Sequence, residues 1–356
     1  MIFQKYFFSK AGQTMRLGQI ELNTGAALAP MAGATDAVMR RLCAEYGAVC
    51  TVSEMISAKA LTMGDRKSIQ LMQGGGGSAP FGIQLFGAEP ETMAEAARIV
   101  CGMREKLAFD FIDLNMGCPA PKITGPGAGS ALLKDPPRAG AIAQAVRNAV
   151  PDEIPVTAKL RIGWDENCMT GVETAQHCAG AGISLWTVHG RTRAEQYEPG
   201  IHADEIAKIR AAVPKEIPIL ANGDVTSAEG ALALLKETGC DGVAVGRGAM
   251  GDPWLFARIA AAMNGAPVPA PPTLAERFRV LRRHIYEMCE EKGEFIAMQQ
   301  ARSHAGWYMR GLRGAASLRR ECCALRHFAD LDALIEHAWA LQSADKDGAA
   351  ERQGGQ

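Results

Sequence analysis

One cysteine of the chain lies where a thiol can take part in acid–base chemistry. Cys118 ends the segment Asp113–Cys118 (DLNMGC) and precedes Pro119, so we expect it on a loop at the end of an apolar strand. A thiol in such a loop can give a proton to a carbon atom. A single cysteine is also commonly a buried, inert packing residue, and the sequence leaves both interpretations open.

Three polar side chains lie within or at the end of apolar runs. Lys159 lies inside the run Pro155–Ile162, where a charge is costly unless it meets a partner. A cation there suits either the underside of a flavin ring or an ion pair inside the fold. Gln84 can donate and accept at once, which suits the edge of a flavin ring, or it lies at a solvent-facing strand end. His189 ends another run, and it donates to a cofactor or substrate or is a structural histidine.

Two glycine-containing segments follow the last two apolar runs. Asn222-Gly223-Asp224 and Gly246-Arg247-Gly248 each come directly after one of these runs. Glycine lets the backbone approach phosphate oxygens closely, and Arg247 adds a positive charge and a fork of N–H donors. Parallel barrels commonly bind phosphate after their last two strands. The pattern therefore predicts a phosphate-binding corner, with a pair of tight turns as the alternative.

These residues need a scaffold that gathers strand ends. Eight short β-type runs alternate with segments whose apolar residues recur about every 3.6 positions, as in amphipathic helices. Eight such repeats indicate an α/β fold, a (β/α)8 TIM barrel over residues 15–265, and a doubly wound parallel sheet is the alternative. In a barrel the polar residues would meet at the C-terminal ends of the strands. The predicted strands are 25–30, 48–53, 81–86, 109–115, 155–161, 183–189, 217–222 and 241–246.

The composition limits the classes of protein that the chain can be. Of its 356 residues 47% are hydrophobic and 22% charged, which allows a large core and excludes a disordered chain. A net charge of -1 excludes a uniformly basic surface but not a single basic face. Ten cysteines without a CxxC pair predict free thiols in a reducing cytoplasm and no metal site. No apolar run is long enough to span a membrane.

The chain changes character outside the predicted barrel. Residues 1–14 form an aromatic N-terminal extension whose apolar run is too broken for a signal peptide. The Pro-rich segment 266–272 is expected to be a linker, followed by a small all-helical domain over 273–342. The polar, Gly-rich tail over 343–356 is expected to be disordered.

The predicted helical domain carries an excess of positive charge. From Thr273 to His327 there are eleven Lys and Arg residues against six Glu. Arg313 and Arg320 belong to this excess, and Trp307 and Tyr308 are interleaved with it. Such a surface suits an RNA backbone, with aromatic side chains stacking on bases, or it is an ordinary solvated helix face.

Several motifs are similar to those of one enzyme family. The chain resembles the tRNA-dihydrouridine synthases, and most closely their DusB-like branch. DLNMGCP together with TVHGRTR is specific for this family, whereas the glycine motifs alone indicate any flavin or phosphate barrel. One departure is Gly125-Pro126-Gly127, where many relatives read Lys-Asn-Gly or Gly-Asn-Gly. The matching segments are Ala29–Asp36, Val52–Met55, Gln84–Gly87, Asp113–Pro119, Gly127–Leu133, Thr187–Arg193, Asn222–Asp224 and Gly246–Trp254.

The resemblance implies an oxidoreductase that uses FMN and NADPH, or NADH, to reduce the C5–C6 bond of a D-loop uridine in tRNA. It implies that Cys118 donates the proton, and we expect the protein to act as a cytoplasmic monomer. The residues expected at the flavin are Pro30, Met31, Ala32, Gln84, Lys159, His189, Asn222, Gly223, Asp224, Gly246 and Arg247. The residues expected at the tRNA are Asn115, Arg191, Arg313 and Arg320.

Two other functions fit parts of the pattern. An FMN barrel dehydrogenase acting on a small pyrimidine would bind the FMN phosphate in the same way, but it would not need the basic helical domain. A tRNA-binding protein with vestigial flavin chemistry would not need Cys118, Lys159 and His189, all of which are present.

Overall fold

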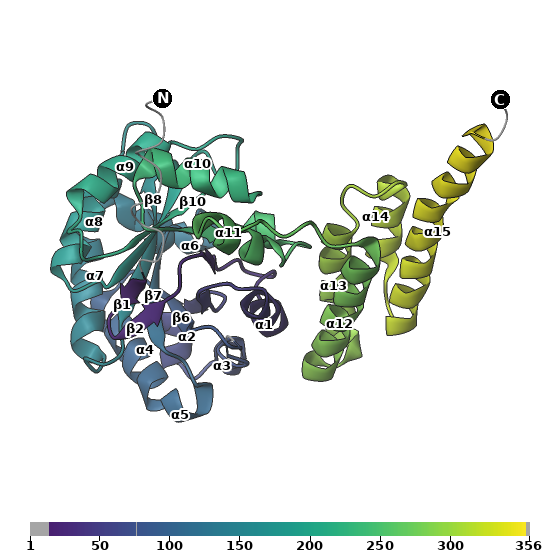
Figure 1. The fold of residues 1–356 in the computed structure, drawn as a ribbon. Coiled ribbons are helices and arrows are strands. Elements are labelled where there is room, and N and C mark those ends of the chain that lie inside the picture. Colours follow the sequence, from purple (N-terminus) through teal and green to yellow (C-terminus); the bar gives the residue numbers. More distant parts are fainter. Residues whose placement is uncertain (1–13, 76, 354–356) are drawn as a thin grey trace, which may run out of the picture. The chain divides into compact units, whose positions relative to one another are not determined.

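The computed structural model of the protein describes residues 14–75 and 77–353 (Figure 1), so the expected N-terminal extension lies outside the described residues except for Thr14. The chain forms two compact units. The first runs to Ala249 and resumes over Trp254–Pro269. The second comprises Met250–Pro253 and the chain from Ala270 onward.

The first unit is a parallel barrel of eight strands surrounded by helices (Figure 1). Its two ends meet because Leu28 N–H donates to Cys50 O at 3.0 Å and Val49 N–H donates to Ala26 O at 2.9 Å. This closure confirms the TIM barrel and excludes the doubly wound sheet. In sheet order the strands are β3 (Ala26–Leu28), β11 (Gly242–Val245), β10 (Ile219–Asn222), β9 (Leu185–Thr192), β8 (Val156–Gly163), β7 (Phe111–Met116), β6 (Phe81–Phe86) and β4 (Thr51–Val52), and β5 (Ile56–Ser57) also pairs with β6.

Helices cover the outside of the barrel, and local sequence sets where they begin. The Asp135 carboxylate accepts from Arg138 N–H, and Pro136 takes the first helical position, where its missing N–H costs nothing. Ser227 caps another helix through Gly230 N–H. The helices are α1 (Ala37–Glu45), α2 (Ala58–Thr62), α3 (Arg66–Leu71), α4 (Pro90–Gly102), α5 (Arg104–Leu107), α6 (Pro121–Thr124), η1 (Gly129–Lys134), α7 (Pro136–Ala149), α8 (Gly171–Gly180), α9 (Ala203–Ala212), α10 (Ala228–Thr238), η2 (Arg247–Ala249) and α11 (Leu255–Met263).

A short hairpin that the sequence did not predict covers the N-terminal end of the barrel. β1 (Met15–Leu17) and β2 (Ile20–Leu22) pair antiparallel. Leu17 and Leu22 are buried in one core cluster with Phe111, Leu185 and Leu220, which lie near the starts of their strands. Three-residue strands are too short to show a hydrophobic period.

β8 and β9 extend beyond their predicted ends, to Gly163 and Thr192. Pairing continues through Arg161↔His189 and Gly163↔Thr192, with an irregularity between the two pairs. The two strands were predicted to end at Arg161 and His189, but both residues and those that follow remain in the sheet. The charged side chains of β8 and β9 therefore belong to the barrel wall.

The second unit is a bundle of four helices, and its core residues include Phe278, Leu281, Met298 and Leu318. The Pro-rich segment 266–272 has no helix or strand. A disordered tail was expected over 343–356, but the last helix continues through Gln353. The end of this helix is rich in good helix formers such as Ala, Lys, Glu and Arg. The helices are α12 (Leu274–Lys292), α13 (Glu294–Tyr308), α14 (Ala315–Ala324) and α15 (Phe328–Gln353).

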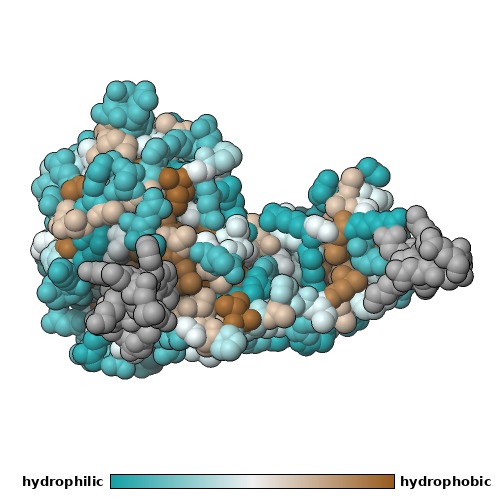
Figure 2. All heavy atoms as spheres, turned by 45° about the horizontal axis from the view of Figure 1, so that its top comes forward, coloured by the Kyte–Doolittle hydropathy of each residue, from teal (hydrophilic) through white to brown (hydrophobic). Residues whose placement is uncertain are grey.

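Hydrophilic residues cover most of the molecular face in Figure 2, and the hydrophobic residues on it form small separate patches. Among the described residues, no helix is long and apolar enough to cross a membrane. The same residues contain no group of three His, Cys, Asp or Glu side chains that could hold a metal ion.

Candidate active site

A buried chain of hydrogen bonds crosses the barrel interior and ends at the Cys118 loop. The Asp113 carboxylate accepts from the Thr157 hydroxyl at 2.5 Å and from Gln84 Nε2 at 2.7 Å. Gln84 Oε1 in turn accepts from Asn115 Nδ2 at 2.9 Å. Asp113 is buried, and burial raises the pKa of its carboxyl group. The chain fixes the Asn115 amide with its oxygen toward the loop.

Several contacts hold the backbone on both sides of the Cys118 thiol. Asn115 Oδ1 accepts from the N–H groups of Gly117 at 3.2 Å and Cys118 at 3.0 Å. The Cys118 carbonyl accepts from the Ser130 N–H at 3.1 Å and hydroxyl at 2.9 Å. Arg161 Nε donates to Gly117 O at 3.0 Å. The thiol is half-buried on a fixed loop, which differs from the inert core position that was its alternative.

Lys159 lies beside Asn115 in the sheet and lines an interior cavity together with Pro30, Asp113 and Thr157. Its ammonium group makes no hydrogen bond or ion pair with another described residue. Burial, followed by the nearby charge of Arg161, lowers the pKa of Lys159 to about 8. The alternative of an interior ion pair is therefore not formed, and the ammonium group is left without an anionic partner among the described residues.

His189 is buried among cations at the C-terminal end of the barrel. Its Nε2 lies 3.0 Å from Arg191 Nη1, and because a guanidinium group only donates, Nε2 accepts and Nδ1 carries the proton. Burial, followed by the charges of Lys159, Arg161, Arg191 and Arg247, lowers the pKa of His189 well below 6.5. The imidazole is neutral near pH 7, and its Nδ1–H is the group that it can offer to a ligand.

Asp224 organises the predicted phosphate corner. Its carboxylate accepts from Arg191 Nη2 at 2.5 Å, Gly200 N–H at 3.2 Å and Arg247 Nη2 at 3.1 Å. Burial alone would raise the pKa of Asp224, but the bond from Arg191 and the charges of both arginines lower it. Two guanidinium groups against one carboxylate leave the corner positive. Gly223 has φ 138°, and a Cβ there would lie 2.6 Å from an Ile201 methyl carbon, so only glycine fits this turn.

Arg191 has a different position from the one expected at a substrate. It is 1% exposed, and it bonds Asp224, His189 and the carbonyl of Glu198. Arg191 therefore supports the two neighbouring site residues. Asn222 is also a supporting residue, because it is buried and its Nδ2 donates to Ala244 O at 2.8 Å.

The segment Pro30-Met31-Ala32 reaches the same corner from β3. A Cβ at Gly246 would lie 3.4 Å from Met31 Sδ, which places Met31 beside the segment after β11. The Thr35 hydroxyl accepts from Met31 N–H at 2.9 Å and fixes the turn. Pro30 and Met31 are half-buried, and Ala32 is exposed. One ligand can therefore contact both segments, since β3 and β11 are neighbours.

The sequence model of the family described as dihydrouridine synthase (Dus) matches residues 27–344 of this chain. The chain belongs to the dihydrouridine synthase family. The protein named "Probable tRNA-dihydrouridine synthase" of Mycobacterium tuberculosis is 39% identical over 330 residues, which cover 90% of this chain and 84% of that protein. The tRNA-dihydrouridine synthase B of Pseudomonas syringae pv. tomato is 40% identical over 306 residues, covering 86% of this chain and 88% of that protein.

The fold of this dihydrouridine synthase family member is also found in solved structures. Histamine dehydrogenase from Rhizobium sp. 4-9 is similar with a TM-score of 0.55 and 14% identity, covering 72% of this chain and 48% of that chain. This similarity concerns the fold alone.

The arginines of the helical unit of this dihydrouridine synthase family member fall into two groups. Arg282 pairs with Asp332 at 2.7 Å, and Arg279 pairs with Glu276 at 2.7 Å, so these charges are neutralised locally. Arg320 is exposed and makes no hydrogen bond or ion pair with a described residue. Arg313 is also exposed, and its backbone bonds Gln342. The charge of Arg320 on α14 is therefore uncompensated among the described residues.

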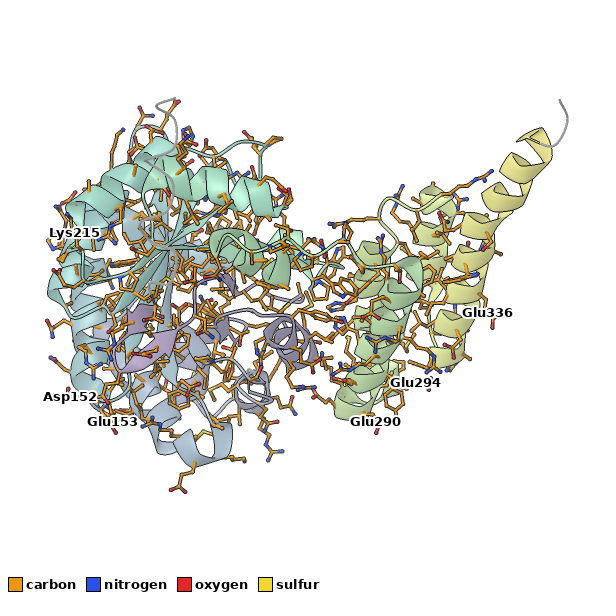
Figure 3. The ribbon with its side chains drawn as sticks, viewed as in Figure 1. Asp152, Glu153, Lys215, Glu290, Glu294 and Glu336 are labelled. Carbon is orange, nitrogen blue, oxygen red and sulfur yellow. The ribbon has the colours of Figure 1, made fainter. Side chains whose placement is uncertain are left out.

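Acidic side chains and one buried aromatic residue make this unit differ from the basic, aromatic surface that the sequence predicted. Glu290 and Glu294 lie at the junction of α12 and α13, and Glu336 lies on α15 (Figure 3). Tyr308 was expected to stack on bases, but it is 0% exposed, with its hydroxyl 3.4 Å from His284 Nδ1. The helix places Tyr308 on the same face as other core residues of α13, whereas Trp307 is half-buried.

Two residues of the site were not predicted. Arg161 is 2% exposed, and it joins Gly117 O to the carbonyl groups of Thr192, the last residue of β9, and Gln196. Tyr197 is 56% exposed, with the guanidinium carbons of Arg161 and Arg247 at 5.7 and 5.3 Å from its ring centre. The sequence signal for Arg161 was its spacing from Lys159, because residues two apart in a strand point to the same face.

Proposed function

We propose that this protein is an FMN-dependent tRNA-dihydrouridine synthase that uses NADPH, or NADH, to reduce the C5–C6 bond of a D-loop uridine, and that it acts as a cytoplasmic monomer. The observation that carries the proposal is the half-buried Cys118 thiol on a fixed loop at the end of a cationic barrel. Named relatives of 39–40% identity act, by their names, on tRNA.

The residues present fit FMN. An added Cβ at Gly246 would come no closer than 3.4 Å to Met31 Sδ, so this segment leaves room for a ligand, and Arg247 with Arg191 makes the corner positive for a phosphate. Asp224 cannot donate to phosphate, so it would act by holding the two arginines or by accepting from ribityl hydroxyl groups.

Lys159 and Gln84 would lie at the ring of FMN, with the neutral imidazole of His189 beside them. Bound FMN supplies hydride chemistry, with NADPH as donor and C6 of uracil as acceptor. The unpaired ammonium of Lys159 stabilises negative charge at the ring. Gln84 Nε2 donates to Asp113 and Gln84 Oε1 accepts from Asn115, so the second Nε2–H is the donor that would remain for a cofactor.

Cys118 completes the reduction by giving the thiol proton to C5 of the uracil ring. The hydride and this proton together account for the two hydrogens added across C5–C6. The base must leave the tRNA stack to reach a thiol on the barrel rim, as in other enzymes that modify bases. Asn115 fixes the loop, and Lys159 and Arg161 lie within electrostatic reach of the thiol.

The test uses purified full-length protein, tRNA from cells that lack the gene, and NADPH or NADH. We expect a yellow protein with about one FMN per chain, and mass spectrometry should show dihydrouridine at one mapped D-loop position. Free uridine and uracil serve as small-molecule controls. Protein that stays colourless with added FMN contradicts the proposal, and reduction of uracil without reduction of tRNA would favour a small-pyrimidine dehydrogenase.

A further inference from the structure

On the barrel rim, two cationic side chains lie against one tryptophan ring, and the proposed flavin site does not use them. Lys134 Nζ lies 4.4 Å from the centre of the Trp164 ring, and Arg193 Cζ lies 4.5 Å from the same centre. The backbone holds this arrangement, because Arg193 N–H donates to Gly163 O at 2.9 Å and Ala194 N–H donates to Trp164 O at 3.0 Å. Lys134 is exposed, and Trp164 and Arg193 are half-buried.

Neither cation has an anionic partner among the described residues. The side chains of Lys134 and Arg193 make no hydrogen bond or ion pair with any of them, and Arg193 Nε is buried without an acceptor. Asp165 and Glu166 follow Trp164 but do not pair with either cation, and Asp165 Oδ1 instead accepts from a backbone N–H. The two cations are therefore uncompensated by the described residues, and Arg193 Nε bears the cost of a buried donor without an acceptor.

The cluster is joined to the catalytic loop by η1. Ser130, the second residue of η1, bonds the Cys118 carbonyl at 3.1 Å, and Lys134 is its last residue. Four residues of a 3-10 helix rise about 8 Å at about 2 Å each. A phosphate near a base held at Cys118 is therefore within reach of the cluster.

We propose that Lys134, Trp164 and Arg193 form a phosphate-binding site on the barrel rim. Stacking on the indole orients the guanidinium group of Arg193, and its two Nη atoms, unlike the buried Nε, are the donors for the oxygens of one phosphate. Lys134 adds a second charge from a compact ammonium group. Two sources share this chemistry: the RNA backbone beside the target uridine, and the 2′-phosphate of NADPH. The choice of substrate rests on the proposed function, whereas the phosphate chemistry does not.

The test compares the double variant Lys134→Gln/Arg193→Gln with Arg98→Gln/Lys208→Gln, which also removes two positive charges. Arg98 and Lys208 are exposed on α4 and α9 and already pair with acids. The affinity for tRNA is measured by fluorescence anisotropy between about 50 and 200 mM salt. The Michaelis constants for NADPH and NADH are measured separately by flavin reduction without tRNA.

If the site binds a phosphate of the RNA, the double variant should bind tRNA about tenfold more weakly. The slope of its log affinity against log salt should be smaller in magnitude by about 1.5. If the site binds the 2′-phosphate of NADPH, the Michaelis constant of the double variant for NADPH should rise to its Michaelis constant for NADH. Trp164→Leu should change the same quantity in the same direction by a smaller factor. Flavin content and thermal unfolding show whether this variant keeps its fold.

The site is contradicted if the double variant matches the control in both tRNA affinity and NADPH selectivity. A wild-type protein that binds tRNA without forming dihydrouridine would contradict the proposed function and still leave the phosphate site testable by binding. A wild-type protein that binds neither tRNA nor NADPH would overturn both proposals.

Discussion

Asn115 holds the backbone of Cys118, with its Oδ1 3.0 Å from the Cys118 amide nitrogen. The other end of the same amide is fixed by Gln84 at 2.9 Å. Asn115 was expected at the substrate base, and its two hydrogen-bonding groups are instead used within the barrel. The position of the thiol therefore depends on a side chain three residues earlier in the sequence.

Asn115→Ala should lower kcat for dihydrouridine formation about 10- to 100-fold, because a small displacement of a catalytic group is costly. The affinity for tRNA should change little, since the amide acts on the loop. Asn148→Ala, an exposed position on α7, is the control. A large rise in KM with unchanged kcat would instead show that Asn115 contacts the base.

Cys118→Ala should keep FMN and the oxidation of NADPH by oxygen while losing about 100- to 10,000-fold in dihydrouridine formation, the range that general acids supply. The matched control is Cys101→Ala, a half-buried cysteine on α4. Single-turnover kinetics with reduced protein isolates the step. Wild-type activity in the variant would remove the thiol as the acid.

Asp113→Asn tests the buried chain behind the loop. An amide places a donor where the carboxylate accepts two hydrogen bonds, so the Gln84 donor or the Thr157 hydroxyl loses its acceptor. The expected loss of unfolding free energy is about 1–3 kcal/mol. We also expect a lower kcat at unchanged tRNA affinity, because Asp113 acts through Asn115.

Asp152→Asn, at an exposed position, is the control that removes one carboxylate away from the buried chain (Figure 3). Equal stability and equal kcat in the two variants would show that the buried chain does not position the thiol.

Lys159 should make FMN binding depend on pH. Its pKa in the protein without ligand is lowered to about 8, so the ammonium group is charged below that pH and loses its proton as pH rises through it. The affinity of the FMN-free protein for FMN should therefore fall between about pH 7 and 9, where a phosphate group is already ionised. Arg161, with a pKa of about 10, and the neutral His189 do not titrate there.

Lys159→Met should bind FMN more weakly with an affinity that is flat over this range, as followed by quenching of flavin fluorescence. The exposed Lys215→Met should behave as the wild type (Figure 3). A fall of equal size in Lys159→Met would assign the pH dependence to another group.

The barrel was predictable because each of its strands is a short apolar run between amphipathic segments. The same alternation placed Cys118 on the loop after its strand, where the structure also has it, whereas Lys159 and His189 lie within β8 and β9. The position of Arg191 was not predictable, because β9 continues to Thr192 and the two-residue period puts Arg191 on the His189 side of the strand.

Other features depend on contacts distant in sequence. The Asp113–Gln84 bond joins residues from two strands, and no spacing along the chain indicates it. The burial of Tyr308 follows from the face of α13 that meets α12, and the sequence showed only an aromatic residue among arginines.

Exposed arginines of the helical unit should contribute to tRNA binding. Arg319→Gln/Arg320→Gln removes two exposed charges of α14 that have no partner among the described residues, whereas Arg279→Gln/Arg282→Gln removes two that already pair with acids. The first pair should weaken tRNA binding about three- to tenfold and reduce its salt dependence, because an uncompensated cation releases counterions from the RNA when it binds. The second pair should have little effect, since breaking an exposed ion pair also frees a carboxylate. Both variants should reduce FMN with NADPH at the wild-type rate. Equal weakening in the two variants would mean that RNA responds to the total charge of the unit, and unchanged binding in both would remove this surface from the tRNA interface.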